Sequence, residues 1–395
     1  MNKFYMYLLK YVIFAFLLLL TTIASAADKL RPVVIGLSAE FGVKNSIAAQ
    51  SIEKGILVAM DEINAQGGVL GGRKLMLDAR DDRGVPARGR DNFNEFSVIP
   101  DVVAVFSGRF SPVTIELAPM ANQRKMLLLC PWSAADTITQ YPYPNYIFRL
   151  SAKDTWAMEA MLDHARTRGF KRIALFLPNT AWGRSSEEAF LQYQKSAHDI
   201  HHVTFKYNWG ETDFRQKIQE AVDSGLEAIV LVSNEAEGTL IIKQISELPS
   251  SKRLPIISHW GITGGDFVKM TEGTLPLVDL TVVQTFTFNN AKSNKAKAVA
   301  KGIERLFGEN VKQLHAQVGF AHAYDLTHML ALAINKAGST DRTAVRTAME
   351  QLATYKGLVR EYDHPFTKTD HEALDRRQLF MGRFDEFGNV RKIGE

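Results

Sequence analysis

The sequence predicts an α/β protein of two lobes, each a parallel β-sheet with helices on both faces. Short apolar runs rich in β-branched residues alternate with longer stretches of helical period along most of the chain. Such alternation is typical of βαβ units. The series breaks at the proline- and tyrosine-rich segment 141–146 and restarts at 155. The chain has 395 residues, enough for two domains that each bury a core.

The first 26 residues have the order of a secretory signal peptide. Lys3 and Lys10 precede the apolar run 12–20, and Ala24-Ser25-Ala26 places small residues where a signal peptidase needs them. The run is shorter than the roughly 20 apolar residues that a membrane-spanning helix requires. Because no cysteine follows it, a lipoprotein anchor is excluded. We expect export and cleavage after Ala26; retention as a membrane anchor is the alternative.

The first series of units contains four predicted strands: 33–37, 74–79, 102–106 and 126–130. Residues 47–64 predict a helix, because apolar side chains recur on one face. Gly67-Gly68 follows it and supplies the positive φ that ends a helix. Ser111-Pro112 predicts another helix start, with Ser111 as N-cap and Pro112 as the first helical residue.

The second series has predicted strands at 172–177, 228–232 and 255–258, with helices at 155–167, 185–197, 214–224 and 238–248. Further along, 282–286 is apolar and extended, and 318–336 is a long helical pattern. The tail 379–387 is short and extended around turn glycines, which predicts a closing β segment.

Composition excludes several classes of protein. The net charge is +4 with dispersed charges, so the sequence shows no basic stripe for nucleic acid. Cys130 is the single cysteine, which leaves no partner for an intramolecular disulfide; it is expected to be a buried thiol at a strand end. Residues 67–72, with four glycines, follow a helix and precede a strand, the reverse of a dinucleotide-binding loop.

Enzyme and metal motifs are also absent from the sequence, which contains no phosphate-binding lysine loop, nucleophile elbow or zinc helix. Asp78, Asp81 and Asp82 lack the glycine and glutamate spacing of a calcium loop, so we expect a solvated turn. His198, His201 and His202 are expected to form a surface cluster instead of a metal site. We therefore expect a protein without catalysis, cofactor or metal.

Several segments together resemble the type I periplasmic binding proteins of the leucine/isoleucine/valine-binding class, which serve ATP-driven importers. The segments are Ile35-Gly36-Leu37, residues 59–64 followed by Gly67-Gly68, Leu77-Asp78 with Asp81-Asp82, Phe148-Arg149, Trp182-Gly183-Arg184 and Tyr324-Asp325. The helix followed by two glycines is the most specific. The likeness covers nearly the whole chain after the signal peptide, in unbroken order.

The resemblance implies a type I fold, with two Rossmann-like lobes joined by a hinge of several crossing segments. It assigns residues 27–150 and 286–356 to the N-terminal lobe, and 151–285 and 357–395 to the C-terminal lobe. It further implies a periplasmic, monomeric protein that closes over a small molecule and delivers it to an inner-membrane ABC permease. The alternatives are a ligand sensor that reports to a membrane receptor and a binder of branched-chain amino acids or amides.

The resemblance also implies a ligand site between the lobes, since ligands bind beyond the carboxyl ends of parallel strands. The positions that it assigns to ligand contacts are Phe41, Arg109, Phe110, Ser111, Trp132, Ser133, Ala134, Trp182, Asn234 and Trp260. Amino-acid binders carry a threonine where this chain has Ala134, and an acidic residue where it has Trp260. Without that carboxylate a ligand ammonium would be poorly held.

Trp132, Trp182 and Trp260 are three of only five tryptophans and fall on positions expected in the cleft. An aromatic or otherwise apolar ligand could stack on these indoles, with Arg109 or the helix end at Ser111 taking an acid group. Alternatively, a quaternary ammonium could lie over the indole faces. Glu235 and Glu237 could then supply counter-charge, although exposed loop carboxylates are more often solvated. The aromatic ligand is our first expectation.

Overall fold

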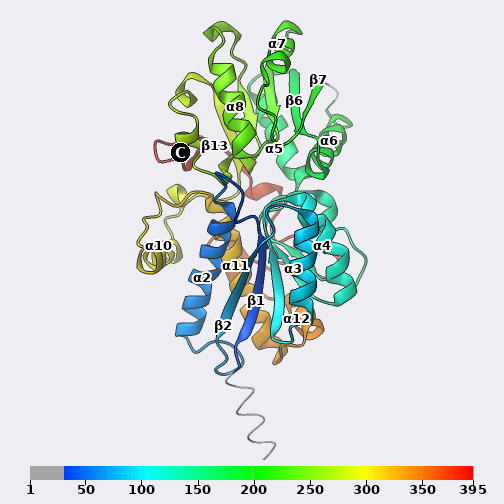
Figure 1. Cartoon of the computed structure of the whole chain (residues 1–395), viewed down its shortest axis with the longest axis vertical. Helices are drawn as coiled ribbons and strands as arrows, with labels where there is room; N and C mark the ends of the chain where they lie inside the picture. The colour runs from blue at the N-terminus through cyan, green and yellow to red at the C-terminus, as the bar shows by residue number, and fades with distance from the viewer. Residues whose placement is uncertain (1–30, 198, 395) are drawn as a thin grey trace, which may run out of the picture.

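The computed structural model describes residues 31–197 and 199–394, which form two lobes, one above the other in Figure 1. The predicted signal peptide, residues 1–26, and His198 of the predicted histidine cluster lie outside the described residues. Each lobe contains one large sheet, as the sequence predicts, and a small hairpin of β11 (Tyr355–Lys356) and β12 (Glu361–Tyr362) forms a third sheet. Within the described residues, no helix combines the length and the apolar character needed to cross a membrane.

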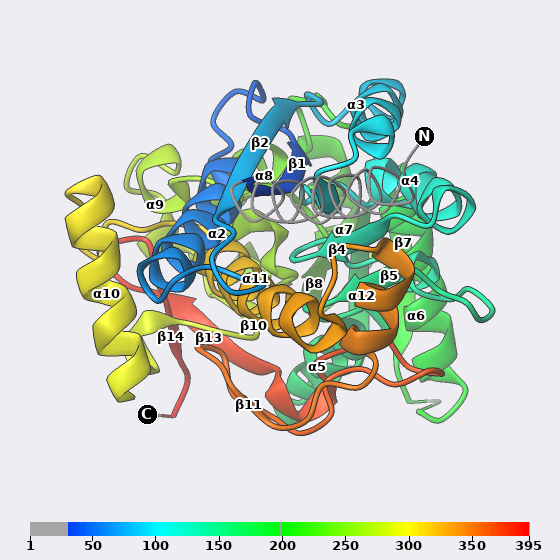
Figure 2. The same cartoon turned by 90° about the horizontal axis from the view of Figure 1, so that it is seen from below.

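The first lobe is built on a five-stranded parallel sheet in the order β2-β1-β3-β4-β5. Its strands are β1 (Val33–Ala39), β2 (Leu75–Asp81), β3 (Val102–Ser107), β4 (Leu127–Cys130) and β5 (Ile147–Arg149). Helices α3 (Pro86–Val98) and α4 (Ser111–Arg124) cover one face. On the other lie α2 (Ala48–Ala65), α11 (Gln317–Ala337) and α12 (Arg342–Met349), with α10 (Asn294–Phe307) beside α2 (Figure 2). Because helices cover both faces, β3 and β4 are buried along their whole length.

The second lobe is built on a seven-stranded sheet in the order β14-β13-β10-β9-β8-β6-β7. Its strands are β6 (Arg172–Pro178), β7 (His201–Tyr207), β8 (Ala228–Leu231), β9 (Ile256–Ser258), β10 (Leu280–Gln284), β13 (Phe380–Phe384) and β14 (Val390–Lys392). Its helices are α5 (Asp154–Thr167), α6 (Ala181–Gln194), α7 (Arg215–Asp223), α8 (Glu235–Ser246) and α9 (Phe267–Met270). β13 runs antiparallel to β10 and to β14, so the predicted closing β segment is confirmed.

Two predicted helix boundaries have different outcomes. α2 ends at Ala65, and Gly67 and Gly68 adopt φ of 107° and 79°, so the predicted helix stop is confirmed. The N-cap of α4 is Phe110, not Ser111, which is already helical. The Ser111 hydroxyl instead accepts hydrogen bonds from the backbone N–H groups of Ala134 and Ala135, both at 3.2 Å. The predicted N-cap was wrong by one residue, because the Ser111 side chain bonds to the loop after β4 and does not cap α4.

Two side chains singled out at strand ends are buried, one as expected and one against expectation. Cys130 is a buried free thiol, as predicted, and burial raises its pKa to about 12. Asp82, which we expected in a solvated turn, is buried and accepts hydrogen bonds from Ser38 Oγ and the Gly84 N–H. Burial raises its pKa to about 6. Among the described residues no group of three or more His, Cys, Asp or Glu is placed to hold a metal ion.

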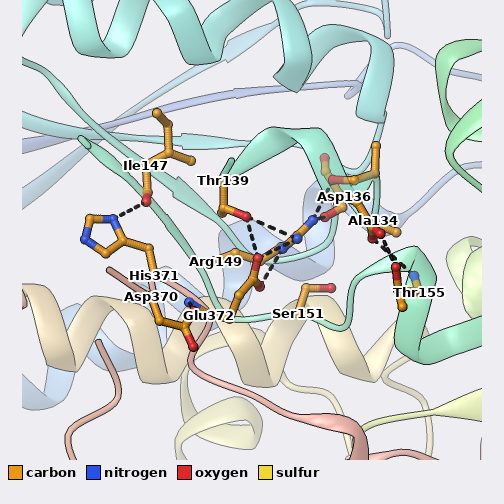
Figure 3. Close-up of polar contacts among 12 residues, drawn as sticks. Ala134, Asp136, Thr139, Ile147, Arg149, Ser151, Thr155, Asp370, His371 and Glu372 are labelled. Atoms are coloured by element: carbon orange, nitrogen blue, oxygen red, sulfur yellow. Dashed lines mark hydrogen bonds and ion pairs between the residues drawn. The ribbon is translucent and has the colours of Figure 1, made fainter. Parts of the chain in front are cut away.

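The chain passes between the lobes in three segments, 150–153, 285–293 and 363–379. A buried ion pair ties the end of β5, where the first segment begins, to the third segment: Arg149 Nε donates to Glu372 Oε2 at 2.8 Å and its Nη2 to Oε1 at 2.6 Å (Figure 3). The guanidinium also donates to the Ala135 carbonyl at 2.8 Å. The backbones of Arg149 and Glu372 form a parallel bridge beside β5. The crossover is therefore anchored by charge and by backbone pairing.

A buried histidine ties the second crossover to the first lobe. Nδ1 of His322, on α11, lies 2.7 Å from the Pro131 carbonyl, and its Nε2 lies 2.9 Å from Thr285 Oγ1. Burial lowers the His322 pKa to about 4. The neutral ring thus donates through Nδ1 and accepts from the threonine hydroxyl, which joins the loop after β4 to the segment that leaves β10.

Candidate ligand-binding site

A small pocket lies between the lobes, at the carboxyl ends of strands from both sheets. Its lining residues are Arg109, Phe110, Ser111, Trp132, Ala134, Trp182, Asn234, His259 and Gly261. Those of the first lobe follow β3 and β4; those of the second follow β6, β8 and β9. Ligands of open α/β sheets bind beyond such strand ends, so the fold itself brings these loops together.

Seven of the ten residues expected in the site line this pocket: Arg109, Phe110, Ser111, Trp132, Ala134, Trp182 and Asn234. Phe41, Ser133 and Trp260 are not among the lining residues. The Ser133 hydroxyl is buried and donates to the Gly108 carbonyl at 3.0 Å. Trp260 is buried and stacks on His259, which does line the pocket, with ring centroids 3.8 Å apart.

The aromatic wall of the second lobe is fixed by a buried aspartate. Trp182 Nε1 donates to Asp154 Oδ1 at 3.1 Å, and the ring lies edge-on to His259 with centroids 4.9 Å apart. The Gly261 N–H donates to His259 Nδ1 at 3.2 Å, so Nδ1 is unprotonated and Nε2 carries the hydrogen. Nε2 lies 3.5 Å from Asp154 Oδ1 and has no hydrogen-bond partner in the described chain. Burial lowers the His259 pKa, so the ring is neutral.

On the first lobe, Trp132 and Phe110 provide the apolar wall. A Cβ on Gly319 of α11 would lie 2.6 Å from the Trp132 ring, so the glycine leaves room for the indole. Phe110 meets Trp209, from the loop after β7, edge to face with centroids 5.0 Å apart. That contact crosses from one lobe to the other and adds aromatic packing beyond simple area burial.

A buried ion pair also crosses the cleft. Arg109, from the loop after β3, donates to both carboxylate oxygens of Glu235, the first residue of α8, with Nη2 and Oε1 2.8 Å apart. Both side chains are almost fully buried. We expected Glu235 and Glu237 to be solvated, which was wrong: Glu235 is sealed by this pair, and buried Glu237 accepts from the Gly210 N–H at 2.9 Å.

A second carboxylate shares the same guanidinium. Glu40 follows β1, and its Oε1 lies 3.5 Å from Arg109 Nε, while its Oε2 accepts the Arg109 backbone N–H at 3.2 Å. Burial raises the pKa of Glu40 to about 7, although the Arg109 charge opposes that shift. Arg109 is therefore already held by Glu235 and Glu40.

The pocket is nearly filled in this structure. Its free volume is about 10 Å³, room for about one water molecule. Backbone contacts also join the lobes, since the Ile47 N–H donates to the Gly264 carbonyl at 2.8 Å. From the first lobe, the Asp136 N–H donates to Ser185 Oγ of α6 at 3.0 Å. The described arrangement is thus a closed one, in which side chains occupy most of the interlobe space.

The residues that sequence reasoning missed are Glu40, Asp154, His259 and Gly261. Glu40 and His259 come directly after β1 and β9, so their position after a strand could have indicated them. Asp154 begins α5 just after a crossover and gave no such signal. Its role depends on Trp182, 28 residues away.

Comparison with known proteins agrees with this architecture. The periplasmic binding protein family matches residues 32–386. A Leu/Ile/Val-binding protein, BraC3, from Rhizobium johnstonii is 25% identical over 336 residues, covering 84% of this chain and 87% of the relative.

Two solved structures share the fold. The branched-chain amino acid transporter substrate-binding protein LivJ from Streptococcus pneumoniae, in complex with isoleucine, matches with a TM-score of 0.76 and 19% identity, over 91% of this chain and 98% of that one. A solute-binding protein from Rhodopseudomonas palustris, in complex with 3,4-dihydroxybenzoic acid, matches with a TM-score of 0.74 and 17% identity, over 92% and 96%. The chain belongs to the type I periplasmic binding proteins, in the Leu/Ile/Val-binding-like family.

Proposed function

We propose that the protein is the substrate-binding component of an ABC importer and captures a small aromatic or otherwise apolar ligand between its lobes. The observation that carries this proposal is the pocket, to which loops of both lobes contribute two indoles and a phenyl ring. Residues 1–26 are the export signal, and the protein acts in the periplasm as a monomer. Its second partner is the permease of the importer.

The proposed mechanism is closure of the lobes about the three crossovers. A ligand that binds first to Trp132 and Phe110 gains contacts with Trp182 and His259 only when the second lobe closes. Because only such differential affinity shifts an open form toward a closed one, the ligand must touch both lobes. The proposed lobes are 27–150 with 286–356, and 151–285 with 357–395. Of the latter, β12 pairs with β11 and so lies with the first lobe.

The charges around the pocket favour an apolar ligand without an ammonium group. None of the nine lining residues is acidic, so none offers a carboxylate to an α-ammonium. Arg109 is held by two carboxylates, which leaves the helix start at Ser111 as the better place for an electron-rich ligand group. His259 Nε2 can donate one further hydrogen bond. The ligand should therefore be neutral or weakly acidic, with a planar apolar body.

A thermal-shift screen tests this function. Aromatic acids and neutral aromatic compounds should raise the Tm, because a ligand stabilises the state that it binds. The screen also includes aliphatic amino acids, amides and quaternary amines, which are the alternative ligand classes. The compound that binds should be recovered unchanged after long incubation with the protein. Stabilisation by leucine or valine alone would reject the ligand class, and conversion of the bound compound would reject a purely binding role.

A further inference from the structure

A second, larger cavity lies outside the ligand pocket. It has a volume of about 620 Å³ and is lined by the second crossover, the loop between β11 and β12, Phe380 of β13 and Lys392 of β14. None of its lining residues belongs to the pocket between Trp132 and Trp182. We call this cavity the crossover groove. Figure 2 shows α10, β14, β13 and β11 on this side of the molecule, away from α3 and α4.

The lining of the crossover groove has an excess of positive charge, although Asp375, outside the lining, offsets part of the charge of Arg360. Five of its lining residues are cationic, namely Lys292, Lys295, Lys356, Arg360 and Lys392, against the single carboxylate of Glu361. Lys292 and Lys356 are exposed and form no ion pair within the described part of the chain. Like charges gathered in one concavity repel one another, and low-dielectric walls focus their field. A bound anion would relieve that repulsion.

Two of the cations are held in place by their surroundings. Lys295 Nζ lies 5.3 Å from the ring centroid of Tyr355 and 5.8 Å from that of Tyr324. Arg360 Nε donates to the Glu361 carbonyl at 2.9 Å, and its Nη1 lies 3.8 Å from Asp375. Such contacts position the positive charges around the groove before any ligand arrives, which lowers the ordering cost of binding.

The size and walls of the groove indicate the class of anion. Its volume falls within the range of small-molecule sites, roughly 300 to 1,000 Å³. Phe286, Leu358 and Val359 add apolar wall beside the lysines. We propose that the crossover groove binds a small multivalent anion that carries phosphate groups, either a soluble phosphorylated compound or a lipid headgroup. The ligand contacts the hairpin of the first lobe and the β13–β14 edge of the second, and so favours their present arrangement.

Pyrophosphate is the test anion for the positive charge of the crossover groove. Calorimetric titration at constant ionic strength should give saturable binding to the full protein and a raised Tm. The double variant Lys292→Gln with Lys356→Gln should bind at least tenfold more weakly. The matched control is Lys297→Gln with Lys301→Gln, which removes the same charge from exposed positions of α10 outside the groove lining. The control should bind like the wild type.

Flotation with phosphatidylglycerol vesicles, against phosphatidylcholine vesicles, separates the two sources of phosphate. Binding of pyrophosphate without vesicle binding supports a soluble anion, and vesicle binding that the groove variant loses supports a headgroup. Absence of both kinds of binding would overturn the proposal. An equal loss in the groove variant and the α10 control would also overturn it, because the effect would then come from net charge alone.

Discussion

Arg109 and Glu235 lie in different lobes and form a two-pronged buried ion pair across the cleft, with Nη2 and Oε1 2.8 Å apart. Arg109 follows β3 of the first sheet and Glu235 follows β8 of the second, so the pair forms where the two lobes meet. Glu40 adds a second carboxylate to the same guanidinium, 3.5 Å from its Nε. Charge pairing thus contributes to closure next to the aromatic walls of the pocket.

Glu235→Gln should open the ligand-free protein. Removing the Glu235 charge leaves buried Arg109 with a neutral amide and with Glu40 3.5 Å from its Nε, which costs up to about 3 to 5 kcal/mol unless the guanidinium becomes hydrated. Opening hydrates it, so the closed fraction should fall. Small-angle X-ray scattering should show a larger radius of gyration than for the wild type. Glu188→Gln, at an exposed position of α6, is the control and should scatter like the wild type. Equal radii for all three proteins would show that the pair does not hold the lobes together.

Glu40 should make stability depend on pH. Its pKa is raised from 4.5 to about 7 by burial, so the folded protein holds a proton that the unfolded chain releases between these values. The contribution of Glu40 to the free energy of unfolding is complete below pH 4.5 and is lost as the pH rises through 7. One pKa unit corresponds to about 1.4 kcal/mol, so the loss is about 3 kcal/mol.

Urea unfolding of the wild type and Glu40→Gln between pH 4.5 and 8 measures this effect. The variant cannot titrate at this position, so its free energy of unfolding should fall less over the range. Asp82, with its pKa raised to about 6, acts in the same direction and is present in both proteins, and its charge contributes to the raised pKa of Glu40. Parallel curves for the two proteins would refute the role assigned to Glu40.

Glu372→Gln should destabilise the crossovers. Arg149 is fully buried, and loss of its carboxylate partner should lower the free energy of unfolding by about 3 to 5 kcal/mol. The control is Glu247→Gln, which breaks an exposed pair with Arg215 and should change stability by less than about 1 kcal/mol. Chemical denaturation measures both. A similar small loss in the two variants would mean that the crossover pair adds little to stability.

Leucine and valine should bind negligibly. No carboxylate lines the pocket to pair with their ammonium group, and an unpaired buried charge costs several kcal/mol. Isothermal titration calorimetry at millimolar amino acid should give only heats of dilution. Saturable binding would contradict the proposed ligand class, because the pocket would then hold an ammonium group without a carboxylate in its lining.

Much of the fold was predictable because buried strands and amphipathic helices leave periodic patterns. Strands β1 to β4 and helices α2 and α11 lie within two residues of their predicted bounds, and the largest differences are the later ends of β1 and β2. The helix α10 was not predicted, although its buried residues Ala296, Val299 and Ile303 recur at helical spacing and give a readable pattern. β7 was missed because its first four residues are exposed or half-buried and polar side chains dominate them.

The candidate site was predictable only in part. Trp132 and Trp182 follow strands, and the resemblance to a known family indicated that they lie in the ligand site. The burial of Glu235 was not predictable, because its partner Arg109 belongs to the other lobe. From the neighbouring residues alone, Glu235 is expected to be an exposed carboxylate at the start of a helix. The same holds for Asp154, whose hydrogen bond to Trp182 depends on how α5 and α6 pack together.

The most direct test is calorimetry on wild type, Trp182→Ala and Trp156→Ala with the compound that the thermal-shift screen identifies. Trp156 is the matched indole, half-buried on α5 under Lys153 and outside the pocket lining. Loss of a stacking indole should weaken binding at least about tenfold in Trp182→Ala, since a lost aromatic contact is worth around a kilocalorie or more. Trp156→Ala should bind like the wild type. Wild-type affinity in Trp182→Ala would contradict capture of the ligand between the aromatic walls of the two lobes.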